Sequence, residues 1–172
     1  FVWYAPMMPH DPHTPPERLL AKYTAKSESL HVARYWAMVE WFDETCGQLL
    51  DYLDREGLAE NTLVFYVTDN GWVQSPDSPR ALPSKLTPND FGLRTPILVR
   101  WTGKVQPRRC DDLAMSIDLV PTVLDALGES RPPAMRGVSL LDEAAVAGRR
   151  TIFGECFTHD AADLNDPAKN LT

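Results

Sequence analysis

Residues 63–72, LVFYVTDNGW, decide the fold of this sequence. The first six of these residues are apolar, aromatic or β-branched, which is typical of a buried strand. The strand stops abruptly at Asp69-Asn70-Gly71. These three residue types are common in tight turns, but the oxygens of Asp69 and Asn70 would also suit a hard cation at the end of a strand. The dipeptide alone does not separate the two interpretations, and by itself it favours the turn.

Three other segments have strand patterns. Residues 1–5, 96–101 and 151–156 are short runs rich in apolar residues, and each predicts a strand. A long Pro-rich loop covers roughly residues 70–94, between two of the predicted strands. Because helical patterns separate the strands, the order indicates an α/β fold.

The helical patterns are clear at three places. From about residue 28 to 56, apolar residues recur at steps of three and four, which predicts one long amphipathic helix that Gly57 is well placed to end. A short helix is expected from Pro16, and another over 116–128, ending at Gly128. The apolar face of the long helix contains Val32, Tyr35, Trp36, Val39, Phe42, Cys46, Leu49, Leu50 and Leu53.

The order of these elements bears on the acid–amide pair. If residues 1–5 and 63–68 are parallel strands joined by the long helix, their carboxyl ends lie on the same edge of the sheet. The first strand leads into His10 and the second into Asp69 and Asn70. We therefore expect a mostly parallel sheet flanked by helices, with these side chains facing one crevice, which is more than a turn requires.

Composition excludes some classes of function. The chain has 172 residues, enough for one sizeable core, and its net charge of −7 without a basic run argues against nucleic acid as a partner. No segment approaches the roughly 20 apolar residues of a membrane span. The three cysteines, Cys46, Cys110 and Cys156, suggest neither a disulfide framework nor a zinc motif. The chain starts without Met inside a predicted strand, so we expect it to be an internal part of a longer protein.

The ordered motifs resemble a known family. They are WYAPMMPHDPHTPP, then ARYWAMVEWFDETCGQLLDYLDREG, then NTLVFYVTDNG, followed by Lys85, DFGLRTPILVRWTGK and SIDLVPTVLDALG. Together they resemble the sulfatase family of the alkaline-phosphatase-like superfamily. The resemblance implies that residues 1–140 are part of the catalytic α/β domain and that 141–172 begin a C-terminal region.

The resemblance also implies roles for single residues. Asp69 and Asn70 match the pair that ligates the divalent cation, expected to be Ca²⁺ with Mg²⁺ as the alternative. Related phosphatases tend to carry Asp-His here, so Asn70 favours a sulfate ester. His10 matches the histidine beside the leaving oxygen of the ester, and Lys85 matches the lysine that contacts the sulfate.

Two departures from the family pattern are visible. Phe91 stands where the family has the first of two glycines after Lys85, and only Gly92 remains. The C/S-x-P-x-R motif, whose Cys or Ser becomes the nucleophilic formylglycine, does not occur in this sequence. We therefore expect the chain by itself to be inactive, with the formylglycine in a missing N-terminal part.

Each candidate residue also has an ordinary structural interpretation. His10 is as typical of a loop between prolines as of a catalytic site, and Lys85 alone is typical of a solvated loop. His13 is more typical of a structural role, and Arg94 of an ion pair with Asp90 that braces the loop. Weaker candidates to face the site are Trp72 and His159.

The leading hypothesis is a sulfatase that acts on a sulfated small molecule or carbohydrate, with His10 as acid and Lys85 on the sulfate. The first alternative is a phosphodiesterase or phosphonate hydrolase of the same superfamily. The second is a degenerate binding protein that retains the fold without catalysis.

Overall fold

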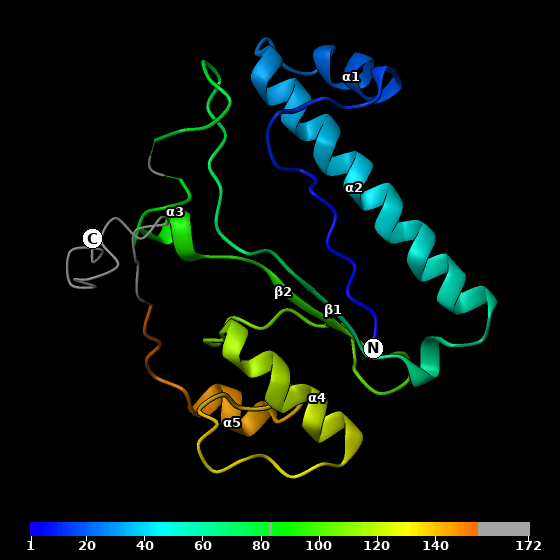
Figure 1. The fold of residues 1–172 in the computed structure, drawn as a ribbon, viewed down its shortest axis with the longest axis vertical. Coiled ribbons are helices and arrows are strands. Elements are labelled where there is room, and N and C mark those ends of the chain that lie inside the picture. Colours follow the sequence, from blue (N-terminus) through cyan, green and yellow to red (C-terminus); the bar gives the residue numbers. More distant parts are fainter. Residues whose placement is uncertain (83, 155–172) are drawn as a thin grey trace, which may run out of the picture. The chain divides into compact units, whose positions relative to one another are not determined.

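The computed structural model describes residues 1–82 and 84–154, which form two compact units (Figure 1). The first unit contains Phe1–Arg55 and Asn70–Leu93. The second unit contains Glu56–Asp69 and Arg94–Thr172, of which residues up to 154 are described. Among the described residues, no helix has both the length and the apolar character needed to cross a membrane.

A helical hairpin dominates the first unit. Helix α1 (Glu17–Thr24) follows Pro16 and packs against the long helix α2 (Leu30–Arg55), as the sequence predicts. The close approach is possible because the buried face of α2 begins with two alanines; the buried residues of the pair are Leu19, Ala33, Ala37 and Met38. After α2, Gly57 has a φ of 68°, a conformation that glycine adopts without strain.

Two ion pairs fasten the exposed side of this hairpin. Lys22 Nζ lies 2.6 Å from Glu40 Oε1, and Arg18 forms a bidentate pair with Glu44. The side-chain hydrogen bonds lower the pKa of both glutamates. Exposed pairs of this kind contribute little to stability, so the hairpin depends mainly on its apolar seam.

The second unit holds the sheet. Strand β1 (Val64–Val67) pairs with β2 (Ile97–Arg100), and Val64 lies opposite Arg100. Both strands lie where the sequence predicts them, and the α/β class is confirmed. The pairing is antiparallel, however, and the sheet has two strands in the described part of the chain. The mostly parallel sheet expected from the sequence is therefore not what these residues form.

One predicted strand, 1–5, is wrong, and the described part of another, 151–156, shows no strand. Residues 1–5 form no strand, and neither do residues 151–154; Phe1, Val2 and Trp3 are exposed. The predicted parallel pairing of 1–5 with 63–68 fails with them. An apolar run becomes a strand only where a neighbouring strand accepts its backbone hydrogen bonds, and the pattern of residues does not reveal that neighbour.

Short helices complete the second unit. A 3₁₀ turn, η1 (Ala59–Asn61), precedes β1, and a second one, η2 (Ser116–Asp118), leads into α4 (Leu119–Leu127). Gly128 ends α4 with a φ of 72°, as predicted. Helix α5 (Glu143–Gly148) begins after Asp142, whose side chain accepts a hydrogen bond from the Ala145 backbone.

A buried ion pair lies at the start of α4. Asp118 is fully buried and accepts two hydrogen bonds from Arg149, at 2.5 and 2.7 Å. It also accepts hydrogen bonds from the backbone N–H groups of Met115 and Val138. Burial alone would raise the pKa of Asp118, but the hydrogen bonds from Arg149, Val138 and Met115 outweigh it and the pKa is lowered.

Candidate functional site

The structure brings His10 and Lys85 into contact within the first unit. Lys85 Nζ lies 2.8 Å from His10 Nε2, although 75 positions separate the two residues. His10 comes from the Pro-rich loop after residues 1–5 and Lys85 from the loop that follows β1. Two loops without regular structure therefore meet through the two side chains that the family resemblance assigns to the sulfate ester.

The second nitrogen of His10 faces Asp11. His10 Nδ1 lies 2.6 Å from the Asp11 carbonyl oxygen and 3.0 Å from its carboxylate Oδ1. Both of these oxygens are acceptors, so Nδ1 carries the hydrogen and Nε2 accepts from the Lys85 ammonium. The arrangement presents Nε2 as the reactive atom of the imidazole, with the Asp11 carboxylate beside Nδ1 on the opposite side of the ring.

Lys85 is held between two anchored neighbours. Ser84 is buried, and its Oγ accepts a hydrogen bond from the Val73 N–H at 3.0 Å. Thr87 Oγ1 donates to the Ser84 carbonyl at 2.9 Å. Between them, Leu86 has a φ of 69°, a left-handed conformation that is strained for a side chain of this size. The loop fixes the backbone of Lys85 tightly, and this is unexpected for a merely solvated lysine.

Gly92 explains how the loop tolerates Phe91. A Cβ at Gly92 would lie 2.4 Å from the Thr87 carbonyl oxygen, so this position has no room for a side chain. Its carbonyl also accepts a hydrogen bond from the Gly71 N–H at 2.8 Å. Phe91, by contrast, is exposed. Both residues lie in the short helix α3 (Asp90–Leu93), where the retained glycine is closely packed and the replaced position is exposed.

An aromatic side chain lies beside Lys85. Its Nζ lies 6.0 Å from the centroid of the Trp72 ring, within the range of a cation–π contact. Trp72 in turn stacks on Tyr35 of α2, with 6.0 Å between the ring centroids. The sequence names Trp72 only as a candidate to face the site, and the structure places it beside Lys85.

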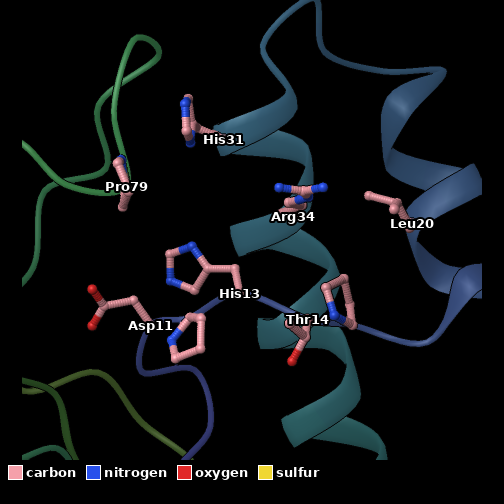
Figure 2. A pocket seen from close by; sticks show the side chains of 9 residues that line it. Asp11, His13, Thr14, Leu20, His31, Arg34 and Pro79 are labelled. Atoms are coloured by element: carbon pink, nitrogen blue, oxygen red, sulfur yellow. The ribbon is translucent and has the colours of Figure 1, made fainter.

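His13 is buried next to the same aromatic pair. Its ring centroid lies 5.5 Å from that of Tyr35 and 6.3 Å from that of Trp72. Burial lowers the pKa of His13 although the nearby Asp11 carboxylate opposes the shift. His13 and Asp11 both line an open pocket with a volume of about 510 Å³ (Figure 2).

The acid–amide pair follows β1 as predicted. Asp69 is exposed and ends its segment of the second unit, and Asn70 is half-buried and begins a segment of the first. Their Cα atoms are about 3.8 Å apart because a trans peptide bond joins them. Asn70 Nδ2 donates to the Gly71 carbonyl at 2.8 Å, which fixes the orientation of the amide.

These two residues fit part of a site for a hard cation. The donor set is a carboxylate and an amide, which are the oxygen ligands that Ca²⁺ and Mg²⁺ take in proteins. In the described ranges, no cluster of three or more His, Cys, Asp or Glu residues could hold a metal ion. Asp69 and Asn70 would thus hold the cation together with ligands from outside this set.

Two sequence hypotheses stay predictions. The ion pair between Arg94 and Asp90 would join residues of different units, and His159 lies outside the described residues. Sequence reasoning missed Asp11 and Ser84. Asp11 could have been noticed because it directly follows His10, whereas nothing in the sequence marks Ser84 as a buried anchor.

Comparison with known proteins identifies sulfatases among the relatives of this chain. The Endo-4-O-sulfatase of Bacteroides thetaiotaomicron is 39% identical over 114 residues, which cover 65% of this chain and 22% of that protein. The uncharacterized sulfatase YdeN of Escherichia coli is 31% identical over 147 residues, covering 81% of this chain and 25% of that protein. The chain therefore spans a quarter or less of the length of these relatives.

The structural comparison agrees. A solved structure from work on the metabolism of multiple glycosaminoglycans by Bacteroides thetaiotaomicron superimposes with a TM-score of 0.63 and 30% identity. The match covers 77% of this chain and 31% of that one. The Sulfatase family matches residues 1–129. The range matched by the family includes both His10 and Lys85, and the chain belongs to the sulfatase family.

Proposed function

We propose that this chain forms part of the catalytic site of an enzyme that hydrolyses sulfate monoesters to an alcohol and inorganic sulfate. The observation that carries the proposal is the 2.8 Å contact between Lys85 Nζ and His10 Nε2. A lysine and a histidine in contact are unusual in a structural role, because neither supplies the negative charge that a buried or braced lysine needs. They are expected where an external anion belongs between them.

Lys85 would bind the sulfate group. A sulfate monoester is already anionic, and further negative charge develops on its leaving oxygen as the S–O bond breaks. The Lys85 ammonium strengthens its interaction as this charge develops, which lowers the barrier to reaction. Trp72 and the anchored Ser84 limit where the Lys85 ammonium can lie. The side chain therefore loses less conformational entropy when the substrate binds.

His10 would act as the acid. When the sulfate draws the Lys85 ammonium away from Nε2, that nitrogen takes a proton from water, while the Asp11 carboxylate 3.0 Å from Nδ1 holds the orientation of the ring. As an attacking oxygen from outside this set of residues bonds to sulfur and the ester S–O bond breaks, Nε2 donates its proton to the leaving oxygen, which departs as the alcohol. Asp11 is a positioning residue in this scheme, since it acts through His10.

Asp69 and Asn70 would hold a divalent cation, for which we propose Ca²⁺ with Mg²⁺ as the alternative. A bound cation supplies electrostatic stabilisation of negative charge on the sulfate oxygens. Calcium takes roughly six to eight oxygen ligands, so this pair is one part of its coordination. The family's formylglycine has no counterpart in this sequence.

We propose a sulfated carbohydrate as the substrate class. The name Endo-4-O-sulfatase and the glycosaminoglycan title of the structural relative support this choice. The test is to assay the whole enzyme, with its metal bound, on 4-nitrophenyl sulfate, 4-nitrophenyl phosphate and sulfated disaccharides. We expect release of sulfate to exceed release of phosphate at equal concentrations. A preference for the phosphate ester would contradict the proposal and favour the phosphohydrolases of the superfamily.

A further inference from the structure

The open pocket beside His10 has the size of a ligand site. Its volume of about 510 Å³ falls within the roughly 300–1,000 Å³ typical of small-molecule sites. In Figure 2, His31 and Arg34 come from the first turns of α2, Leu20 comes from α1, and Pro79 comes from the loop opposite. All of these residues belong to the first unit.

Two basic side chains, His31 and Arg34, line the pocket wall. Over residues 1–82 and 84–154, the Arg34 guanidinium and the His31 ring make no hydrogen bond or ion pair. A free guanidinium offers donors in a planar fork that fits a carboxylate or a sulfate. Because Leu30 begins α2, both residues lie in its first turns, where the helix dipole also favours negative charge.

A buried histidine at the same wall is unsatisfied. His13 is 8% exposed, and its Nε2 has no hydrogen-bond partner in the described part of the chain. Buried polar atoms are nearly always paired, with protein, water or ligand. An unpaired Nε2 next to a pocket therefore indicates that something polar belongs there.

The pocket is directly connected to the proposed reaction centre. Asp11 lines it, and the carboxylate of this residue also lies 3.0 Å from His10 Nδ1. His10 is the proposed acid for the leaving oxygen, so the alcohol part of the substrate lies next to the His10 imidazole. A substrate longer than one sugar ring would extend past His10 toward Asp11 and the pocket.

We infer that this pocket is a subsite that binds an anionic group, a carboxylate or a second sulfate, on the sugar ring adjacent to the one that loses its sulfate. Arg34 is the main contact, His31 assists it, and Asp11 accepts hydrogen bonds from ring hydroxyls. The inference rests on the proposed function and adds the specificity of the same site. A leaving group without negative charge would offer the Arg34 guanidinium no anionic partner.

The test compares substrates that reach the pocket with one that does not. Arg34→Gln in the whole metal-loaded enzyme is assayed on 4-nitrophenyl sulfate and on three sulfated disaccharides. The adjacent ring of the disaccharides carries a carboxylate, a sulfate or no charge. We expect kcat/KM for the two charged disaccharides to fall about tenfold or more beyond any fall for 4-nitrophenyl sulfate. The larger of the two losses identifies the preferred anion.

Arg55→Gln is the matched control, because Arg55 lies at the other end of α2 and does not line the pocket. Arg34→Lys should recover part of the loss, since it restores charge but not the fork. Equal losses on all four substrates, or on charged and uncharged disaccharides, would overturn the subsite and leave the proposed function standing. If the wild-type enzyme released sulfate from none of the four substrates, both the subsite and the proposed function would be overturned.

Discussion

Lys85 Nζ and His10 Nε2 lie 2.8 Å apart, and the other nitrogen of the same imidazole faces Asp11. The three side chains form a line from an ammonium through an imidazole to a carboxylate. A substrate anion can therefore interact with the ammonium while the carboxylate keeps the imidazole oriented.

Replacing Lys85 with alanine should impair turnover much more than folding. Loss of one donor to developing charge typically costs about a hundredfold to a thousandfold in rate. Lys85 lies in a loop, so the melting temperature should change little; surface changes usually stay within about 0.5 kcal/mol. Steady-state kinetics on 4-nitrophenyl sulfate and thermal melting of the same sample measure both. Near-normal turnover would mean that Lys85 is only a solvated loop residue.

Asp11→Asn should lower kcat most for substrates with poor leaving groups. The variant removes the carboxylate that orients His10 through Nδ1, and only a poor leaving group depends strongly on a well-placed acid. We expect a loss of about tenfold on an alkyl or sugar sulfate and a smaller loss on 4-nitrophenyl sulfate. Asp77→Asn, at an exposed position in the opposite loop, is the control. A fall in kcat that does not depend on the leaving group would mean that Asp11 supports folding and does not act through His10.

Asp69→Ala should remove bound metal and activity together, because a charged ligand is lost. Asn70→Ala should weaken metal binding less, since its amide is neutral. Elemental analysis of purified variants after dialysis checks the order of the two effects. Unchanged metal content in Asp69→Ala would show that the pair serves only as a turn.

Gly92→Ala should destabilise the first unit, since the new Cβ would lie 2.4 Å from a carbonyl oxygen. Overpacking of this kind costs about 1–3 kcal/mol, and the same shift should displace Lys85 and reduce turnover. Gly47→Ala, in the middle of α2 with nothing within 4 Å of its Cβ, should instead raise stability by up to about 1 kcal/mol. Urea unfolding should show changes of opposite sign in the free energy of unfolding of the two variants, relative to the wild type.

Asp118→Asn should destabilise the protein by about 3–5 kcal/mol, because it leaves Arg149 without its buried partner. The folded-state pKa of Asp118 is lowered, so its carboxylate stabilises the fold above the unfolded pKa. That contribution is lost as the pH falls through the lowered folded pKa. Unfolding free energies measured from pH 6 downward should therefore decline less steeply in Asp118→Asn. A parallel decline would mean that Asp118 does not carry this pH dependence.

Local patterns predicted the helices and two of the strands well. The period of three to four residues located α2, and glycines at positions 57 and 128 marked the ends of helices through their left-handed backbone. β1 and β2 were recognised by their apolar and β-branched residues. These features depend on neighbours in sequence, so a single sequence contains them.

Contacts between segments far apart in the chain could not be predicted from the sequence. Residues 1–5 have the composition of a strand but no strand forms there, because composition does not specify a hydrogen-bonding neighbour. The meeting of His10 with Lys85 was inferred only through family resemblance, since both stand in loops without periodicity. Burial of Ser84 and Asp118 was equally invisible, as polar residues give no apolar signal to mark them.

The hydrogen bonds of Asp118 make one carboxylate a junction for three distant pieces of chain, at Met115, Val138 and Arg149. If any one piece separated alone, the charge would remain buried with fewer partners, and that intermediate is costly. Fraying of α5 by itself is therefore suppressed, and the region from η2 to Arg149 should open as one cooperative block. Amide hydrogens at Met115 and Val138 should then exchange with solvent at a common free energy of opening, rather than in the graded order expected of independent loops.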